Sequence, residues 1–301
     1  MQIIINLMIF LITLFLYIHI NFQCRTNNDL EIFDIDNITK DQLEEVCNYK
    51  QPILFKFYMD DLNNNLKLDD ILSKYRTFDV NIRNILESAN NTTINNNLPD
   101  NDATILPLQL KETEKLIYKD TSGTYISEYN KDFIEDTTLK RHFESSDIFL
   151  RPHLCSECQY DIIFGSQDSY TPLRYELNVR NFIYVVDGSV EIMLTIPNNS
   201  KYLDVVKDYE LFEFRSRYNP FNQTHVEQLE RVKFLTVTLS PGDILFIPFK
   251  WFYTIKFSSS KTVVATLKYR VVMNTLAIIP DLGYRFLEHQ NIKFNFLNTI
   301  S

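Results

Sequence analysis

The chain has little glycine and no excess of positive charge. Only five of its 301 residues are Gly, so each of them is expected where the backbone requires it. Lys and Arg total 30 against 39 Asp and Glu, which leaves a formal charge of −9. Binding to a phosphate backbone relies on clustered Lys and Arg. We therefore expect no nucleic acid among its partners.

The spacing of a zinc finger is also missing. The four cysteines are Cys24, Cys47 and the pair Cys155 and Cys158, with His153 two residues before that pair. No second pair of Cys or His follows at the distance that a finger needs, so we expect no structural zinc. The pair is then a short-range disulfide, a redox dithiol or two buried thiols. An even count of Cys in a chain that enters the secretory route supports the disulfide.

What the chain has in quantity is apolar side chains. Hydrophobic residues make up 45% and aromatic residues 14% of the sequence, which excludes a disordered or fibrous protein. The length predicts about two domains. Asn and Ile are abundant and Ala is rare, a skew toward AT-rich codons that indicates an AT-rich source such as a large DNA virus or a protist.

The N-terminus reads as a membrane segment. Residues 3–20 are almost entirely apolar and long enough to cross a hydrocarbon core of about 30 Å. A cleaved signal peptide carries a basic start and small residues at its cleavage site. Here only Met1 and Gln2 precede the run, and residues 21–23 are not small. We therefore predict an uncleaved single-pass signal-anchor over residues 1–22, with a secreted body as the alternative if the segment is cleaved.

The sequence gives weaker evidence for the side of the membrane on which the body lies. Arg25 is a single charge after the apolar run, which gives no firm orientation. The sequence carries five acceptor motifs for N-glycosylation, which fit a lumenal or extracellular body; these are Asn37, Asn90, Asn91, Asn198 and Asn222.

Residues 23–147 form a polar lead-in with signs of helices. Thr39 and Gln42 have the spacing of a capping box, which predicts a short amphipathic helix. The other expected elements are a strand over residues 52–57, helices over 66–75 and 80–88, and a polar loop over 90–102.

From residue 148 to 272 the pattern changes to short strands separated by turns. Asp187, Gly188 and Ser189 lie between two apolar runs, a strong signal for a hairpin. Pro241 and Gly242 mark a second tight turn. The expected strands are 181–186, 190–196, 235–239, 244–247, 251–257 and 262–272. The fold class is therefore mainly β, an antiparallel barrel or jelly roll, followed by a C-terminal extension over residues 273–301.

Three stretches of this region resemble one known family. Residues 161–173 read DIIFGSQDSYTPL, residues 181–188 read NFIYVVDG, and residues 240–251 read SPGDILFIPFKW. They resemble the signature stretches of the cupin-like JmjC oxygenases, and Gly165, Gly188 and Gly242 fall on motif positions. The resemblance covers residues 152–272 and implies a double-stranded β-helix, which is the jelly roll of that family.

The resemblance also implies a chemistry that this chain does not match. The family holds Fe(II) with two His and one carboxylate and binds 2-oxoglutarate beside it. Those three positions carry Arg174, Glu176 and Tyr253 here, while the family's 2-oxoglutarate lysine falls on Val190 and its pocket threonine is kept as Thr171. Arg has no lone pair to offer a cation, and a Tyr phenol has a pKa of about 10. We therefore expect no metal and no cofactor.

The extra residue between the first and second stretches leaves a shift of register open. A shift by one would place Tyr175 and Leu177 at the metal positions, and no shift brings in a histidine. In the unshifted register Arg174 and Glu176 face the same way. We predict that they form a buried pair with Tyr253 as a hydrogen-bond partner; the alternative is a solvated rim.

Thr171, Asn181 and Trp251 are the candidate residues of a pocket inside the barrel. Trp251 has aromatic neighbours in Phe249, Phe252 and Tyr253. These rings either form a cage for a ligand or, as alternating strand residues more often do, pack in the core.

Two classes of function follow. The first is a membrane-anchored, catalytically inactive module that binds a protein partner or a small anionic ligand, or that serves a structural role. The second is an active Fe(II) and 2-oxoglutarate-dependent protein hydroxylase with a non-standard site. It would need Glu176, Tyr253 and a further ligand such as His153 or Cys155 to converge.

Overall fold

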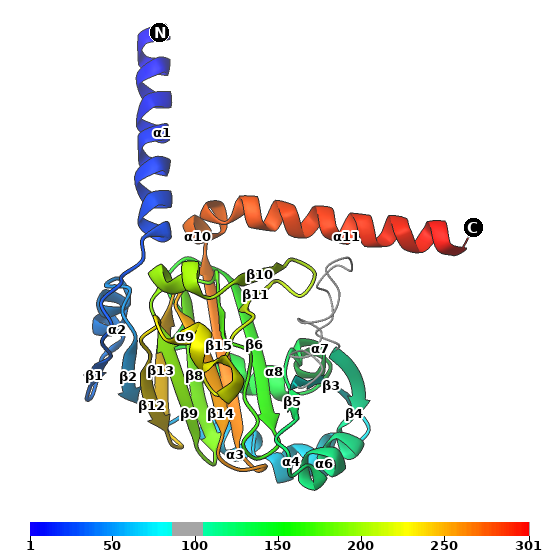
Figure 1. Ribbon diagram of the computed structural model, residues 1–301. Coiled ribbons are helices and arrows are strands. Elements are labelled where there is room, and N and C mark those ends of the chain that lie inside the picture. Colours follow the sequence, from blue (N-terminus) through cyan, green and yellow to red (C-terminus); the bar gives the residue numbers. More distant parts are fainter. Residues whose placement is uncertain (86–104, 301) are drawn as a thin grey trace.

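Two β-sheets form the body of the protein (Figure 1). The structure is a computed structural model that describes residues 1–85 and 105–300, with the backbone alone over 292–300. The nine-stranded sheet has the order β1 (Phe33–Ile35), β2 (Ile53–Lys56), β13 (Asp243–Pro248), β8 (Arg180–Asp187), β15 (Val263–Val271), β6 (Cys155–Gly165), β5 (Tyr125–Ser127), β3 (Asp79–Asn84) and β4 (Ile105–Gln109). The six-stranded sheet has the order β10 (Val205–Asp208), β11 (Glu213–Ser216), β7 (Arg174–Tyr175), β14 (Phe252–Phe257), β9 (Val190–Thr195) and β12 (Leu235–Leu239). The mainly β jelly-roll prediction is confirmed.

Alternation along the strands divides the core into two layers. Phe182 and Tyr184 of β8 pack with the lead-in helices in an outer cluster, whereas Ile183 joins a second cluster with Ile192 of β9 and Ile255 of β14. Because successive strand residues point to opposite faces, this second cluster lies between the two sheets. We call it the interior cluster.

The interior cluster fills the barrel with hydrocarbon. Its buried members are Ile85, Ile126, Ile163, Ile183, Val185, Val190, Ile192, Leu194, Leu239, Leu245, Ile247, Trp251, Tyr253, Ile255, Phe257 and Val264. Both sheets contribute to it, so it holds them face to face.

The turn at Gly188 does not form the predicted hairpin, which corrects the sequence prediction, and the second tight turn, at Gly242, does not join paired strands either. Strands are present on both sides of each turn, but β8 pairs with β13 and β15, and β9 pairs with β12 and β14. Each turn therefore carries the chain from one sheet to the other. Gly188 has φ +75°, and a Cβ there would lie 2.3 Å from the Thr262 hydroxyl. The residue types at each turn determine that the chain reverses tightly there. Which strands then pair depends on strands that are distant in the sequence and on the burial of both faces of each sheet.

The lead-in confirms most of its predicted elements. The Thr39 hydroxyl accepts a hydrogen bond from the Gln42 N–H, and the Gln42 side chain accepts one from the Thr39 N–H, so the capping box is present at the start of α2 (Lys40–Cys47). The strand β2 and the helix α4 (Leu68–Tyr75) lie where they were expected. The predicted loop over residues 90–102 lies outside the described residues.

The helix predicted over residues 80–88 is wrong for residues 80–84; its last residues, 86–88, lie outside the described part of the chain. Residues 79–84 form β3, which pairs with β4 on one side and β5 on the other. Val80 and Ile82 alternate into the core with 2% and 6% exposure, which is the periodicity of a strand. Pairing on both edges outweighs the weak helical spacing of this polar segment.

Several helices of the described residues were not predicted individually. They cover the outer face of the nine-stranded sheet or connect strands, and comprise α3 (Asp60–Asn65), α6 (Leu110–Lys119), α7 (Lys131–Asp136), α8 (Leu139–Ser146), α9 (Val226–Leu229), η1 (Pro197–Tyr202) and η2 (Gln223–His225).

Helices at both ends of the chain leave the body from the same side (Figure 1). α1 (Gln2–Cys24) has no buried residue and a mean hydropathy of 2.5, and among the described residues it is the one helix long and apolar enough to cross a membrane. A signal sequence has the same length and composition. After β15 the chain forms α10 (Val272–Ala277), which contacts α1, and then α11 (Ile279–Ile300).

Candidate functional site

The three residues that the resemblance assigns to the family's metal-ligand positions lie together inside the barrel. Arg174 and Tyr253 are direct neighbours in the pairing of β7 with β14. The Arg174 guanidinium lies 5.8 Å from the centre of the Tyr253 ring, and the Tyr253 hydroxyl donates a hydrogen bond of 3.0 Å to Glu176. Arg174 and Tyr253 are 3% and 2% exposed, so this is a buried site and not a solvated rim.

The counter-ion predicted for Arg174 is wrong. Its guanidinium donates to Glu128 at 2.7 Å and to Glu213 at 3.0 Å. Glu176 instead accepts from the ammonium of Lys268 at 2.6 Å. Both partners of Arg174 come from elsewhere in the sequence: Glu128 follows β5, and Glu213 lies on β11, which pairs with β7. Neighbours in space, rather than the residue two positions along the strand, neutralise the charge.

Arg83 completes a closed arrangement of four charges. Its side chain contacts Glu128 at 2.7 Å and Glu213 at 2.9 Å. Each carboxylate thus bridges the guanidinium groups of Arg83 and Arg174, and all four side chains are at most 3% exposed. Glu213 also contacts Arg215 at 3.2 Å, and Arg215 in turn pairs with Asp208 at 3.4 Å. We call Arg83, Glu128, Arg174 and Glu213 the ion cluster. Its formal charges cancel, which is the condition for keeping charge in a dry interior.

Tyr129 packs against both cations of the ion cluster. The guanidinium carbons of Arg83 and Arg174 lie 5.7 and 5.5 Å from the centre of its ring, within the range of cation–π attraction. The backbone of Tyr129 is left-handed, with φ 64°. Asp161 accepts the backbone N–H groups of Tyr129 and Asn130, each at 2.8 Å. These bonds stabilise a conformation that costs about 1–3 kcal/mol for a non-glycine residue.

The electrostatics keep the site in one protonation state near neutral pH. Burial alone would raise the pKa of Glu213, but Arg83 and Arg174 outweigh it and hold that pKa well below its usual range. Burial, together with Glu176, raises the pKa of Tyr253 to about 12. Burial lowers the pKa of Lys268, yet Glu176 outweighs this effect and the pKa is raised. Tyr253 is therefore a neutral phenol, which is a poor metal ligand.

The candidate pocket residues serve the fold of the barrel. The Thr171 hydroxyl accepts from the Ile255 N–H at 2.9 Å, and the Asn181 amide donates to the Ile247 carbonyl at 3.0 Å. Trp251 has no exposed surface and belongs to the interior cluster.

The neighbouring aromatic rings do not share one cage. Trp251 packs in the interior cluster, Phe252 in a second cluster with Leu173, and Phe249 in a third with Leu177. Rings that alternate along a strand point to opposite faces. The core-packing alternative therefore describes them.

Hydrocarbon also occupies the position of the family's 2-oxoglutarate lysine. Val190 has no exposed surface and belongs to the interior cluster together with Ile192 and Leu194. A dicarboxylate would have to displace these side chains and would meet no cation at Val190. The residues at this position do not fit that cofactor.

The donor set does not fit a metal either. Over residues 1–85 and 105–300, no group of three or more His, Cys, Asp or Glu side chains could hold a metal ion. Glu176 already accepts hydrogen bonds from Lys268 and Tyr253. His153 is exposed and does not join these residues.

The two cysteines of the CxxC pair lie close together on β6. Their sulfur atoms are 3.5 Å apart as free thiols. Residues three apart on a regular strand point to opposite faces. Here Arg270 pairs with Glu157 and Val271 pairs with Cys155, so β6 has one extra residue between these two pairs. This bulge turns both thiols to the same side of the strand.

We expect this pair to be oxidised when the body passes through an oxidising compartment. Burial and the contact with Cys158 raise the pKa of Cys155 to about 12, so the reduced thiol reacts slowly with alkylating agents. Protein made through the secretory route, unfolded and alkylated without reductant, should carry the label at Cys24 and Cys47 and not at Cys155 or Cys158. Labelling at all four sites would contradict the prediction.

Sequence searching missed the residues that neutralise Arg174. Glu128 and Glu213 are two of 39 acidic residues and lie in no motif. Alternation along β11 gave no signal either, because Glu213 and Phe214 are adjacent and both are buried.

Comparison with known proteins agrees with this architecture. The cupin-like domain matches residues 39–274, a stretch that includes the lead-in from the capping box onward, every strand of both sheets except β1, and the ion cluster. No curated protein matches the chain. Since the match spans well over half of the sequence, the chain belongs to the cupin-like domain family.

Proposed function

We propose that this chain is a membrane-anchored, non-catalytic cupin-like protein that acts as a binding or structural module. The observation that supports the proposal is the ion cluster. Arg174 stands at a metal-ligand position of the family and is held by Glu128 and Glu213 at 2.7 and 3.0 Å. A guanidinium cannot ligate a cation, and its charge would repel one.

The filled interior supports the same proposal. Oxygenases of this architecture need room beside the metal for a co-substrate. The interior cluster places Val190, Trp251 and Ile255 there, each with no exposed surface. The barrel therefore suits a rigid, non-catalytic domain better than an enzyme that has to bind a co-substrate.

We infer a protein, rather than a small anion, as the partner of the body. Arg174 is buried and already contacts two carboxylates, so it offers little to an incoming anion.

The test is binding of Fe(II) and 2-oxoglutarate to the full-length protein. We expect no shift of the melting temperature with either ligand, alone or together, and no iron after anaerobic loading and desalting. A ligand at 100 times its dissociation constant would stabilise the fold by about 2.7 kcal/mol, which such a measurement detects. Stoichiometric iron would overturn the proposal and favour the hydroxylase.

We propose that α1 is the membrane anchor, because none of its side chains is fully buried in the body. We propose a single-pass topology with a lumenal or extracellular body, encoded by an AT-rich genome such as that of a large DNA virus. Of the described glycosylation motifs, Asn37 and Asn198 are exposed.

Expression through the secretory route should therefore give a band that shifts down when N-glycans are removed enzymatically. Asn37→Gln and Asn198→Gln should each remove part of that shift. A chain that stays in the membrane pellet after alkaline carbonate but carries no glycan would place the body on the cytosolic side.

A further inference from the structure

The C-terminal helix α11 lies across the end of the body from which α1 departs. Figure 1 shows α1 extending away from this end of the body and α11 running crosswise to it, beside the β10–β11 hairpin. α10 contacts α1 and leads directly into α11. One face of α1 is half-buried near its end, and it comprises Leu16, His19, Ile20 and Gln23. These residues have the spacing of one helical face. The contact with α10 therefore involves the last turns of α1.

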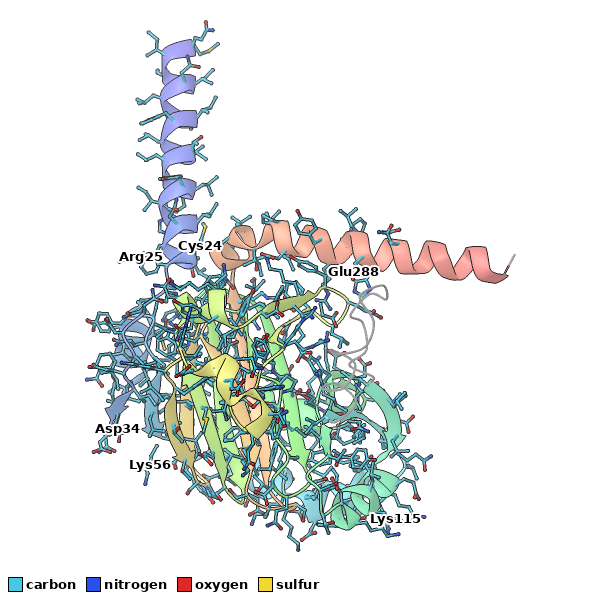
Figure 2. The ribbon with its side chains drawn as sticks, viewed as in Figure 1. Cys24, Arg25, Asp34, Lys56, Lys115 and Glu288 are labelled. Carbon is cyan, nitrogen blue, oxygen red and sulfur yellow. The ribbon has the colours of Figure 1, made fainter. Side chains whose placement is uncertain are left out.

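One face of α11 is attached to the body through polar and aromatic groups. Asp281 accepts a hydrogen bond of 3.2 Å from the Tyr209 hydroxyl, and the ring of Tyr284 lies 5.4 Å from that of Tyr209. The Arg285 guanidinium lies 5.0 Å from the centre of the Phe212 ring. Figure 2 shows Glu288 on this same side.

The opposite face of α11 carries exposed apolar side chains, with the exposed Gln290 among them, and has no partner in the described residues. Ile279, Phe286 and Leu287 are 54%, 63% and 58% exposed. Their spacing of seven and eight residues places them on one stripe of a helix. A Cβ at Gly283, four residues after Ile279, would meet nothing within 4 Å.

The lengths place this stripe at the level of a membrane surface. The 23 residues of α1 span about 35 Å, against about 30 Å of hydrocarbon. If α1 crosses the bilayer, the hydrocarbon ends within its last turns, which are the turns that contact α10. α11 then begins at the interface and runs parallel to it.

We propose that α11 is an interfacial helix, whose stripe of Ile279, Phe286 and Leu287 inserts into the lipid surface of the membrane that α1 crosses. The proposal rests on the membrane anchor of the proposed function. A helix with one apolar face lies in the interface with that face about 5–10 Å deep. The body would then be attached to the bilayer through both α1 and α11, and these two attachments would fix its orientation.

The experiment uses the full chain, reconstituted into phosphatidylcholine vesicles whose acyl chains carry bromine, a quencher of tryptophan fluorescence. The probe variant is Phe286→Trp, with Leu287→Trp as a second probe if the first does not fold. The unmodified chain gives the baseline, because its single tryptophan, Trp251, is buried in the barrel. Tyr118→Trp is the matched control, since Tyr118 is an exposed aromatic residue on α6, a helix at the far end of the body (Figure 1).

We expect blue-shifted emission and strong quenching by brominated lipid for the probe at residue 286, and neither effect for the control. A probe quenched by aqueous iodide and not by lipid would overturn the proposal. A probe shielded from both quenchers would also overturn it and would indicate a protein partner on α11. A chain that floats free of the vesicles would show that the anchor itself fails, whereas a vesicle-bound chain without quenching would exclude the interfacial helix alone.

Discussion

Arg174→Ala is expected to lower the free energy of unfolding by about 3–5 kcal/mol, the typical loss when one partner of a buried ion pair is removed. The substitution leaves Glu128 and Glu213 with Arg83 as their shared partner at 2.7 and 2.9 Å. Glu213 keeps a second contact, with the less buried Arg215 at 3.2 Å, whereas Glu128 has to share Arg83. It also empties the space between the rings of Tyr129 and Tyr253. Since domains have about 5–15 kcal/mol in total, the loss is a large share of the stability.

The measurement is urea unfolding of the full chain in detergent, followed by far-UV circular dichroism. Lys115→Ala is the control: Lys115 pairs with Glu112 at 3.0 Å, but both side chains are about half exposed, and such pairs contribute about 0–1 kcal/mol. Arg174→Lys should recover part of the loss, because an ammonium restores the charge that Nη1 presents to both carboxylates but not the planar group beside the rings of Tyr129 and Tyr253. Equal losses for Arg174→Ala and Lys115→Ala would show that the ion cluster is not a source of stability.

The second large effect is a loss of stability in acid. Arg83 and Arg174 hold the pKa of Glu213 well below its usual range, although burial opposes them. In the unfolded chain the same group has a pKa of about 4.3. Its contribution is therefore fully present above about pH 4.3 and is lost as the pH falls below that value toward the folded pKa. We expect the unfolding free energy to fall steeply from about pH 4 downward.

Glu213→Gln separates this effect from general acid unfolding. The variant keeps the shape of the side chain and loses its charge, so it should be less stable than the parent at pH 7 and should lose less stability on acidification. The two curves are expected to converge at low pH. Glu227→Gln, a change at an exposed carboxylate on α9, should run parallel to the parent. Parallel curves for Glu213→Gln as well would mean that Glu213 does not couple folding to protons.

The strands of the barrel could be predicted from the sequence because the features that indicate them are local. Alternating apolar runs, Gly188 with its positive φ and the capping box at Thr39 each depend on a few adjacent residues. The pairing of those strands was not local. The Asp-Gly turn between β8 and β9 looked like a hairpin, yet the two strands lie in different sheets. A turn specifies that the chain reverses; the strands beyond it specify which edge it meets.

The candidate site divides in the same way. That Arg174, Glu176 and Tyr253 stand where the family has its metal ligands followed from motif and residue type. That Arg174 pairs with Glu128 and Glu213, and Glu176 with Lys268, did not follow from any pattern. These partners come from segments 39 to 92 residues away, and a charged side chain carries no periodicity that identifies its counter-ion.

Residue chemistry alone was therefore enough to establish an apolar N-terminal helix, a glycine-punctuated β domain and side chains unsuited to holding iron. The fold was needed to establish the ion cluster, the packed barrel interior and the free apolar face of α11. The reason is physical: the donor properties of Arg and the length of an apolar run belong to residues or short segments. Charge neutralisation and burial depend on what long-range pairing brings within a few ångströms.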